Sequence, residues 1–328
     1  GAWSNIDIDV SDGDRITGLV SWRNELWVFK GPYKGSIHRI TGSSSSDFAR
    51  SSFIQGVGCV AHNSIFKFGS DIGFLWSDGT VRSLLATDKY GDVQEAALSS
   101  GIHNWIREHV RFTSLNTASA AVSDQFGIVL FALPIDGASL PNVILMMDFR
   151  FTPVRWALWS GFTSILALGS VVDSAASNRR IIMAACTDGF VRKMEQSTRA
   201  LDGTDPYTYK VTTPYMNYGS PHFMKIPAHA AVGIQPRNTG NFTFGWQNDN
   251  NAQKTVTMSQ GGGSALGSFV LNTDVLGGGL SINRFVELIE GGEFRAVQLQ
   301  VTHTVASDID LHSLSLDVEM NAAASWEN

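Results

Sequence analysis

The sequence predicts an all-β protein with two domains, a β-propeller-like domain of four-stranded blades in residues 1–200 and a C-terminal β-sandwich in residues 201–328. Three observations predict this class. The 328 residues include 32 glycines and almost no long stretch of helical periodicity, which is the profile of a β-rich chain with many turns. Short runs of aromatic and β-branched residues are separated by Asn, Asp, Gly and Ser, as in hairpins. One hairpin sequence also occurs twice, which indicates an internal repeat.

Four segments of the first domain share a plan of successive strands and tight turns. They are Arg15–Gly42, Val57–Ala86, Ala118–Ser160 and Ile165–Ser197. The second segment contains Asp-Gly between two apolar runs, which is the strongest short signal for a hairpin. A meander of this size cannot bury both of its faces alone, so it needs neighbours of the same kind. We therefore predict that each segment forms one blade that packs against the next.

The repeated hairpin supports this interpretation. Trp76–Arg82 reads WSDGTVR, and Cys186–Arg192 reads CTDGFVR. Together with the repeated plan of strands and turns, the match favours a radial repeat of blades. We interpret Asp78 and Asp188 as hairpin-turn residues that tolerate a positive φ beside glycine.

Two features interrupt or end the first domain. Residues 93–112 contain a helical candidate, with apolar residues from Ile102 to Val110 close to helical spacing, and we expect a helical insertion there between the second and third blades. The composition changes near Arg199, where a linker-like stretch begins. Seven segments of alternating apolar and polar residues follow, which predicts strands with one buried face each and therefore a β-sandwich.

The composition excludes several classes of protein. The net charge is −6, which argues against a nucleic-acid-binding surface or a polybasic membrane patch. No run of 18 apolar residues is present, so we expect no transmembrane helix, and no basic start precedes an apolar run, so we expect no secretory signal. Cys59 and Cys186 lie in apolar runs, which favours reduced, buried core residues. A disulfide between them is the alternative.

The sequence offers no recognisable catalytic, cofactor-binding or metal site. His103 and His109 would lie on different faces of a helix, and no metal-binding motif is present. Ser77–Thr80 is similar to the Asp-box turns of sialidases but lacks their spacing and the aromatic residue that follows. We therefore predict that the chain is not an enzyme and has no cofactor, although paired catalytic carboxylates cannot be identified from one sequence because their separation is spatial.

Several of these stretches resemble a known family. The runs ITGLVSWRNELWVFK…SIHRITG, GVGCVAHNSIFKFGSDIGFLWSDGTVR and SAAVSDQFGIVLFALP…NVILMMDFRFTPVRWALW resemble tail structural proteins of tailed bacteriophages. The likeness is to the nozzle or tail-hub components of short-tailed phages and covers about residues 10 to 200. The C-terminal part is similar to the sandwich of such proteins in layout only, with Lys225 and the turn at Gly291–Arg295 as anchors.

The resemblance implies a virion protein of the phage tail that is assembled in the host cytoplasm. It implies a homo-oligomeric ring of cyclic symmetry, with six-fold the order it suggests, around the DNA channel below the portal and adaptor. Further partners would be fibre or spike proteins, with passing contact between the ring and genomic DNA. The four readable blades are fewer than a large nozzle would carry.

An alternative from a different class stays open. Propellers host glycosidases, and the chain could be a propeller glycosidase or a glycan-binding tail spike that acts on host surface polysaccharide. Trp156 and Trp159 could line a carbohydrate site, although aromatic residues more often wedge between sheets.

Overall fold

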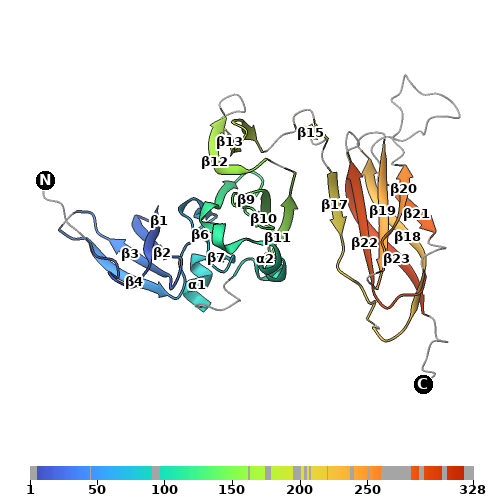
Figure 1. Cartoon of the computed structure of the whole chain (residues 1–328), viewed down its shortest axis with the longest axis horizontal. Coiled ribbons are helices and arrows are strands. Elements are labelled where there is room, and N and C mark those ends of the chain that lie inside the picture. Colours follow the sequence, from blue (N-terminus) through green and yellow to red (C-terminus); the bar gives the residue numbers. More distant parts are fainter. Residues whose placement is uncertain are drawn as a thin grey trace. The chain divides into compact units, whose positions relative to one another are not determined.

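The computed structural model in Figure 1 describes residues 6–44, 46–90, 97–161, 163–173, 179–194, 201–202, 205–206, 208–219, 221–236, 240–249, 251–259, 282–287, 292–304 and 309–320. This part of the chain is all-β with a few short helices, and its sheets are antiparallel, which confirms the predicted class at this level. The chain divides into two compact units, Gly1–Gln196 and Ser197–Asn328. No helix in the described ranges is long and apolar enough to span a membrane.

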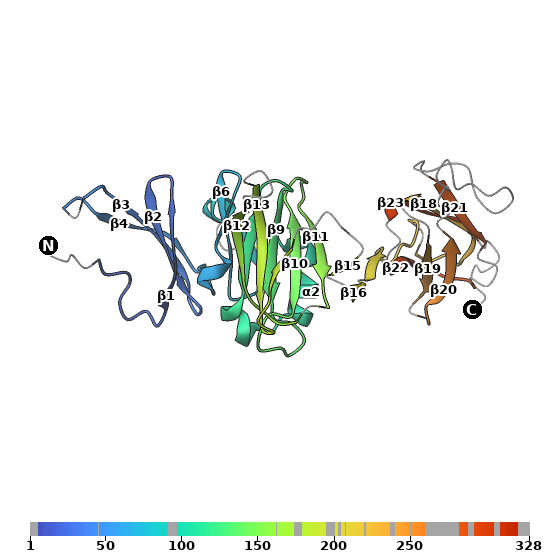
Figure 2. The same ribbon diagram turned by 90° about the horizontal axis from the view of Figure 1, so that it is seen from above.

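Within the described residues, the first unit contains four sheets, and in each the strands follow one another in chain order. Figure 2 shows the same unit from above. The first sheet consists of β1 (Arg15–Trp22), β2 (Glu25–Gly31), β3 (Ser36–Thr41) and β4 (Ala49–Gln55), and the second of β5 (Phe66–Phe68), β6 (Asp71–Leu75) and β7 (Val81–Ser83). The third sheet consists of β8 (Ser119–Ser123), β9 (Ile128–Leu133), β10 (Val143–Asp148) and β11 (Arg155–Trp159), and the fourth of β12 (Ile165–Asp173), β13 (Arg179–Cys186) and β14 (Val191–Lys193).

The four sheets stack face to face in chain order, because each consecutive pair encloses its own apolar core. Strand β9 shows how this works, since all six of its residues are buried. Successive side chains of a strand point to opposite faces, so Phe131 packs towards the second sheet and Leu130 towards the fourth. The first and second sheets enclose a third core, which contains Phe29 and Phe74 with ring centroids 5.2 Å apart. The stack is therefore a linear series with two ends.

The strands predicted in the four segments are largely present, but the prediction of four strands in every blade is wrong for the second and fourth sheets, which have three strands each in the described residues. Strand β4 was not predicted from the sequence, because Ala49–Gln55 is polar and mostly exposed and shows no alternation of apolar residues. It pairs with β3 through the backbone.

Helical elements differ from the prediction in two places. The helix α1 (Leu84–Tyr90) follows β7 directly, and the Ser83 hydroxyl caps it by accepting a hydrogen bond from the N–H of Ala86 at 3.1 Å. This short helix was not predicted. In the region expected to be a helical insertion, the structure has the turns η3 (Ser100–Ile102), α2 (His103–His109) and η4 (Phe112–Thr117) rather than one helix, while residues 93–96 lie outside the described part. One further 3₁₀ turn, η1 (His62–Ser64), precedes β5.

Within the described residues, the second unit has two larger sheets that enclose one shared core. One sheet has the order β17 (Thr208–Thr212), β22 (Val297–Thr304), β19 (Asn241–Asn248) and β20 (Lys254–Ser259), and the other has the order β21 (Ile282–Glu287), β18 (Lys225–Pro236) and β23 (Ile309–Met320). A small hairpin of β15 (Leu201–Asp202) and β16 (Asp205–Pro206) precedes them. These two sheets correspond to the seven segments that the sequence predicts as strands.

Lys225, an anchor of the sequence resemblance, is fully buried at the start of β18. Its backbone pairs with Phe294, and its ammonium group donates hydrogen bonds to the carbonyl oxygens of Phe223 at 3.0 Å and Arg295 at 3.3 Å. Carbonyl oxygens replace the water that a buried ammonium group loses. The two anchors named from the sequence therefore lie next to each other.

Candidate functional site

The two Asp-Gly hairpins have the same backbone arrangement. The Gly79 N–H donates to the Trp76 carbonyl at 3.0 Å, and the Gly189 N–H donates to the Cys186 carbonyl at 3.2 Å. The glycines have φ values of 78° and 85°, whereas neither aspartate is among the described residues with positive φ. The interpretation of Asp78 and Asp188 as positive-φ residues is therefore wrong.

Each aspartate instead organises its turn by accepting hydrogen bonds. Asp78 accepts from the backbone N–H of Thr80 at 2.8 Å, and its second oxygen lies 3.2 Å from the guanidinium of Arg82. Asp188 accepts from the N–H of Phe190 at 3.0 Å and lies 2.7 Å from Arg192. These contacts hold the pKa of Asp188 at about 2, chiefly through the hydrogen bond from Arg192. The spacing of Asp and Arg that the two hairpins share thus serves a local charge-assisted contact in each.

Only the first of these turns is covered by another element within the described residues of the first unit. The N–H of Leu98 donates to the Val81 carbonyl at 2.8 Å, and this bond fixes the start of the helical segment beside β7. Ile106 of α2 is then fully buried in the core between the second and third sheets. A Cβ atom on Gly79 would lie 2.7 Å from Ile106 Cγ2 and 3.1 Å from Phe112 Cε1, while nothing lies within 4 Å of the same position on Gly189.

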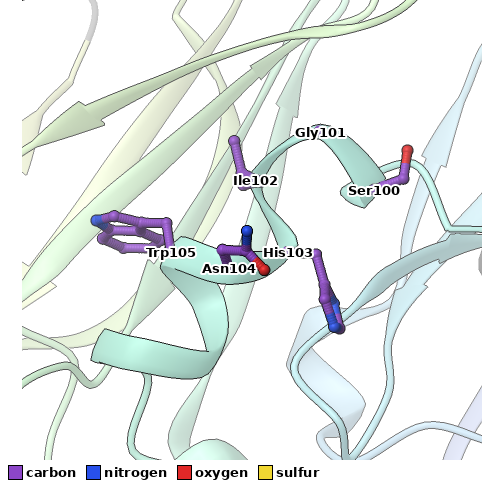
Figure 3. Close-up of a pocket in the computed structure, with 6 residues that line it drawn as sticks. All are labelled: Ser100, Gly101, Ile102, His103, Asn104 and Trp105. Carbon is purple, nitrogen blue, oxygen red and sulfur yellow. The ribbon is translucent and has the colours of Figure 1, made fainter. Parts of the chain in front are cut away.

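A hollow forms where the helical segment meets the first turn. It has a volume of about 550 Å³ and is lined by Asp78, His103, Arg107 and Phe112. A second hollow of about 380 Å³ is lined by residues 100–105 and shares His103 with the first (Figure 3). Figure 3 shows the side chains of His103 and Trp105 pointing away from each other. Because burial of Ile106 fixes the rotation of α2, it also fixes His103 and Arg107 on the side of the hollow.

The hollow offers hydrogen-bonding groups beside an aromatic ring. Within the described residues, Arg107 makes no ion pair, and the Nδ1 atom of His103 is buried without a hydrogen-bond partner. Phe112 is 40% exposed. Asp78 is the one carboxylate among the lining residues, and Thr80 and Arg82 already engage it. The arrangement can bind an anionic or hydroxyl-bearing ligand.

The other residues considered from the sequence lie apart from this hollow. His109 contacts Asp136 at 2.9 Å. Cys59 and Cys186 are both buried, as predicted, and lie in two different cores, and burial raises the pKa of Cys59 to about 11. Trp156 and Trp159 pack against two different cores, as wedges between sheets. No group of three metal-ligating side chains occurs in the described ranges, and the loops at 261–263 and 277–279 lie outside them.

Sequence reasoning identified His103 and Asp78 but missed Arg107 and Phe112 as lining residues. Arg107 lies one turn after His103 on α2, and this i, i+4 spacing was the available signal for it. Phe112 begins the separate turn η4, and no signal in the sequence places it beside the hollow. The position of α2 beside an Asp-Gly turn depends on tertiary packing.

No family model and no curated protein matches the chain. Among solved structures, the chain is similar to the exo-β-1,3-galactanase of Phanerochaete chrysosporium with galactose, at 9% identity and a TM-score of 0.29, over 91% of this chain and 80% of that one. Two substituted forms of the same galactanase with β-1,3-galactotriose match over the same shares at 9% and 10% identity, again with a TM-score of 0.29.

The prediction that the chain is not an enzyme is contradicted by these matches, since the matched structures are those of galactanases, and it is withdrawn. Its physical weakness is that it rested on the absence of linear motifs, whereas catalytic carboxylates come together in space. At a TM-score of 0.29 the similarity assigns neither an activity nor a site to this chain.

Proposed function

We propose that this chain is a structural subunit of the tail of a short-tailed bacteriophage, where copies of it form a ring around the DNA channel. It would seal or extend the channel and dock other tail proteins. The observation that carries the proposal is the open stack of four sheets, whose first and last sheets each have one face outside the series. Two unlike ends can join copies head to tail, and such contacts form a ring when the rotation closes.

We also propose the architecture of each unit. The four sheets of the first unit would be successive blades of a β-propeller, and the second unit would be a β-sandwich. Two observations support the blades. Each sheet is a meander in chain order, and the first strands of consecutive sheets meet, since β8 contacts both β5 and β12. Blades of a propeller pack in this way, with one strand of each near the axis.

The expected partners follow from the resemblance of residues 10–200 to nozzle and tail-hub proteins. The ring would contact the portal or adaptor and the fibre or spike proteins, in the virion, after assembly in the host cytoplasm. Six-fold symmetry is the expected order. The net charge of −6 supports a channel wall along which DNA passes, because a basic lining would bind phosphates and retain the DNA.

The test is the mass of the purified protein and of its native complex, measured by mass photometry and followed by negative-stain imaging. Rings with a mass that is a multiple of 35.6 kDa, or a subunit found in intact phage particles, would support the proposal. A stable monomer that associates with no particle would overturn it.

A second candidate function is favoured by the hollow beside Asp78. Sugars bind where hydrogen-bonding side chains lie beside exposed aromatic rings, and here Arg107 and His103 lie beside Phe112. The chain would then act on host surface polysaccharide as a glycosidase or a glycan-binding tail spike.

This candidate is tested by binding and turnover of host capsule and lipopolysaccharide by the full chain. Arg107→Ala should lower glycan affinity about tenfold, whereas Arg155→Ala, which removes an exposed arginine of β11, should leave it unchanged. Equal binding by both variants, or no binding by the unchanged chain, would count against the candidate.

A further inference from the structure

The two hollows of the helical segment differ in the chemistry of their linings. The larger one, of about 550 Å³, contains charged side chains and an aromatic ring, and is lined by Asp78, His103, Arg107 and Phe112. The smaller one, of about 380 Å³, is lined by residues 100–105, which supply a hydroxyl, an amide and an indole ring but no carboxylate, arginine or lysine (Figure 3). Both volumes fall in the range of small-molecule sites in proteins.

Arg107 carries the uncompensated charge of the larger hollow. The Asp78 carboxylate accepts hydrogen bonds from the N–H and the hydroxyl of Thr80 and lies 3.2 Å from the guanidinium of Arg82, so its charge is already balanced. The ion pairs of the described residues do not include Arg107. Glu108 does not face it, because consecutive residues of a helix point to different sides. The hollow therefore offers a guanidinium group to an anion.

Each hollow also has an aromatic side chain with part of its surface accessible. Phe112 is 40% exposed in the larger hollow. Trp105 is half-buried in the smaller one, where it packs against the core between the second and third sheets. An accessible aromatic ring beside hydrogen-bonding side chains suits a ligand that is apolar on one face and polar at its edge, as a sugar ring is.

His103 lines both hollows, so groups bound in them are neighbours. His103 and Arg107 are four residues apart on α2 and lie one above the other on the same face. The Nδ1 atom of His103 is buried, so Nε2 is the ring atom that can meet a ligand, and a ring nitrogen can donate to or accept from a hydroxyl group. Two adjoining hollows of unlike charge fit two linked sugars, one acidic and one neutral, better than a single small anion.

We propose that the helical segment binds an acidic oligosaccharide. The acid group of one sugar pairs with Arg107 in the larger hollow, where its ring lies on Phe112, and the adjoining neutral sugar lies in the smaller hollow beside Asn104 and Trp105. Asp78 disfavours an acid group at the turn and so restricts that group to the Arg107 side. This inference rests on the glycan-binding candidate above and adds the class of its ligand, a polysaccharide that contains acidic sugars.

A matched pair of probes tests the charge selectivity of the full chain. One probe is a disaccharide of a uronic acid and a neutral hexose, and the other is its methyl ester, which has nearly the same shape without the charge. Isothermal titration calorimetry should show about tenfold tighter binding of the acid, and added salt should reduce this difference. Equal affinities, or binding of host polysaccharide but of neither probe, would overturn the inference and leave the glycan-binding candidate. A chain that binds neither the probes nor host polysaccharide would overturn both.

Two substitutions of exposed residues test which hollow takes which sugar. Arg107→Ala should reduce the affinity for the acid about tenfold, to that of the ester, and leave the ester unchanged. Asn104→Ala should weaken both probes equally, about threefold, and leave the binding of free uronic acid unchanged. Arg155→Ala on β11 is the control for the loss of an arginine. A loss for the ester as large as that for the acid in Arg107→Ala would overturn the placement of the acid group.

Competition with inorganic phosphate separates a sugar site from a general anion site. Phosphate should displace the acidic disaccharide only weakly, because it meets Arg107 but contacts neither Phe112 nor Trp105. Phosphate that binds as tightly as the disaccharide would overturn the proposal, since the two aromatic rings and the smaller hollow would then contribute nothing to binding.

Discussion

The two Asp-Gly hairpins share a sequence pattern, a turn and an Asp–Arg contact, yet they differ in what surrounds them. Ile106 and Phe112 cover the first turn at Gly79, whereas nothing lies within 4 Å of a Cβ position on Gly189 in the second turn. The side chain of Arg82 is 5% exposed and that of Arg192 is 33% exposed. The comparison teaches that the motif determines the conformation of the hairpin. The element that packs on the hairpin determines how much the turn stabilises the fold and which of its residues stay exposed.

The largest expected difference between the turns follows from adding one methyl group to each glycine. Gly79→Ala should destabilise the first unit by about 3 kcal/mol, because left-handed strain adds to a clash with Ile106. Gly189→Ala has the strain alone and should cost about 1 kcal/mol. Urea unfolding followed by tryptophan fluorescence measures this, since seven of the nine tryptophans lie in residues 1–196. Equal costs would show that Ile106 and Phe112 do not constrain the first turn.

The two arginines should differ by a smaller amount. Arg82 donates to Thr80 Oγ1 at 3.0 Å as well as to Asp78, and it is nearly buried. Arg82→Ala should therefore cost about 2 kcal/mol through lost packing and hydrogen bonds. Arg192→Ala removes a more exposed ion pair and should cost at most about 1 kcal/mol. Unfolding of both variants under one set of conditions checks the order, and a larger cost at Arg192 would contradict it.

Strands and turns could be predicted from the sequence because their signals are local. Strand β9 is a run of apolar residues between turn residues, and Asp-Gly marks both hairpins. Strand β4 lacks such a signal, because its pairing with β3 uses the backbone and its first four side chains are exposed, although Phe53 and Ile54 at its end pack in the core. The helix α1 is too short for its periodicity to show, and its cap at Ser83 becomes recognisable only when the strand before it ends.

The candidate site could be predicted less well than the fold. Asp78 and His103 were visible as individual residues, but their meeting across a hollow depends on how far Ile106 is buried. The hydrogen bonds of Asp78 also correct the prediction that this residue has a positive φ. Its carboxylate accepts a hydrogen bond from the backbone N–H of Thr80, two residues further along, and this contact needs no left-handed backbone.

A double-mutant cycle measures how strongly Phe112 constrains the first turn. In the Phe112→Ala background, Gly79→Ala should cost about 1 kcal/mol less than in the unchanged chain, because the neighbouring segment can shift away from the added methyl group. Gly189→Ala should cost the same in both backgrounds, since nothing lies within 4 Å of that position. Unfolding midpoints of the six proteins give both couplings. Additivity at Gly79 would mean that Phe112 does not press on the turn.

The smallest effect is a dependence on pH at the exposed turn. The pKa of Asp188 is lowered from 3.8 to about 2 in the folded chain, first by the hydrogen bond from Arg192 and then by the Phe190 N–H. Since the folded pKa lies below the unfolded one, the carboxylate stabilises the fold above about pH 4, and this contribution is lost as the pH falls towards 2. Asp188→Asn should therefore destabilise the first unit at pH 5, and its difference from the unchanged chain should shrink steadily below pH 4. Asp124→Asn, on an exposed turn of the third sheet, is the matched control. If the stability difference between Asp188→Asn and the unchanged chain stays constant from pH 5 to pH 2, the contact between Asp188 and Arg192 does not form in solution. The two turns would then share only their backbone conformation.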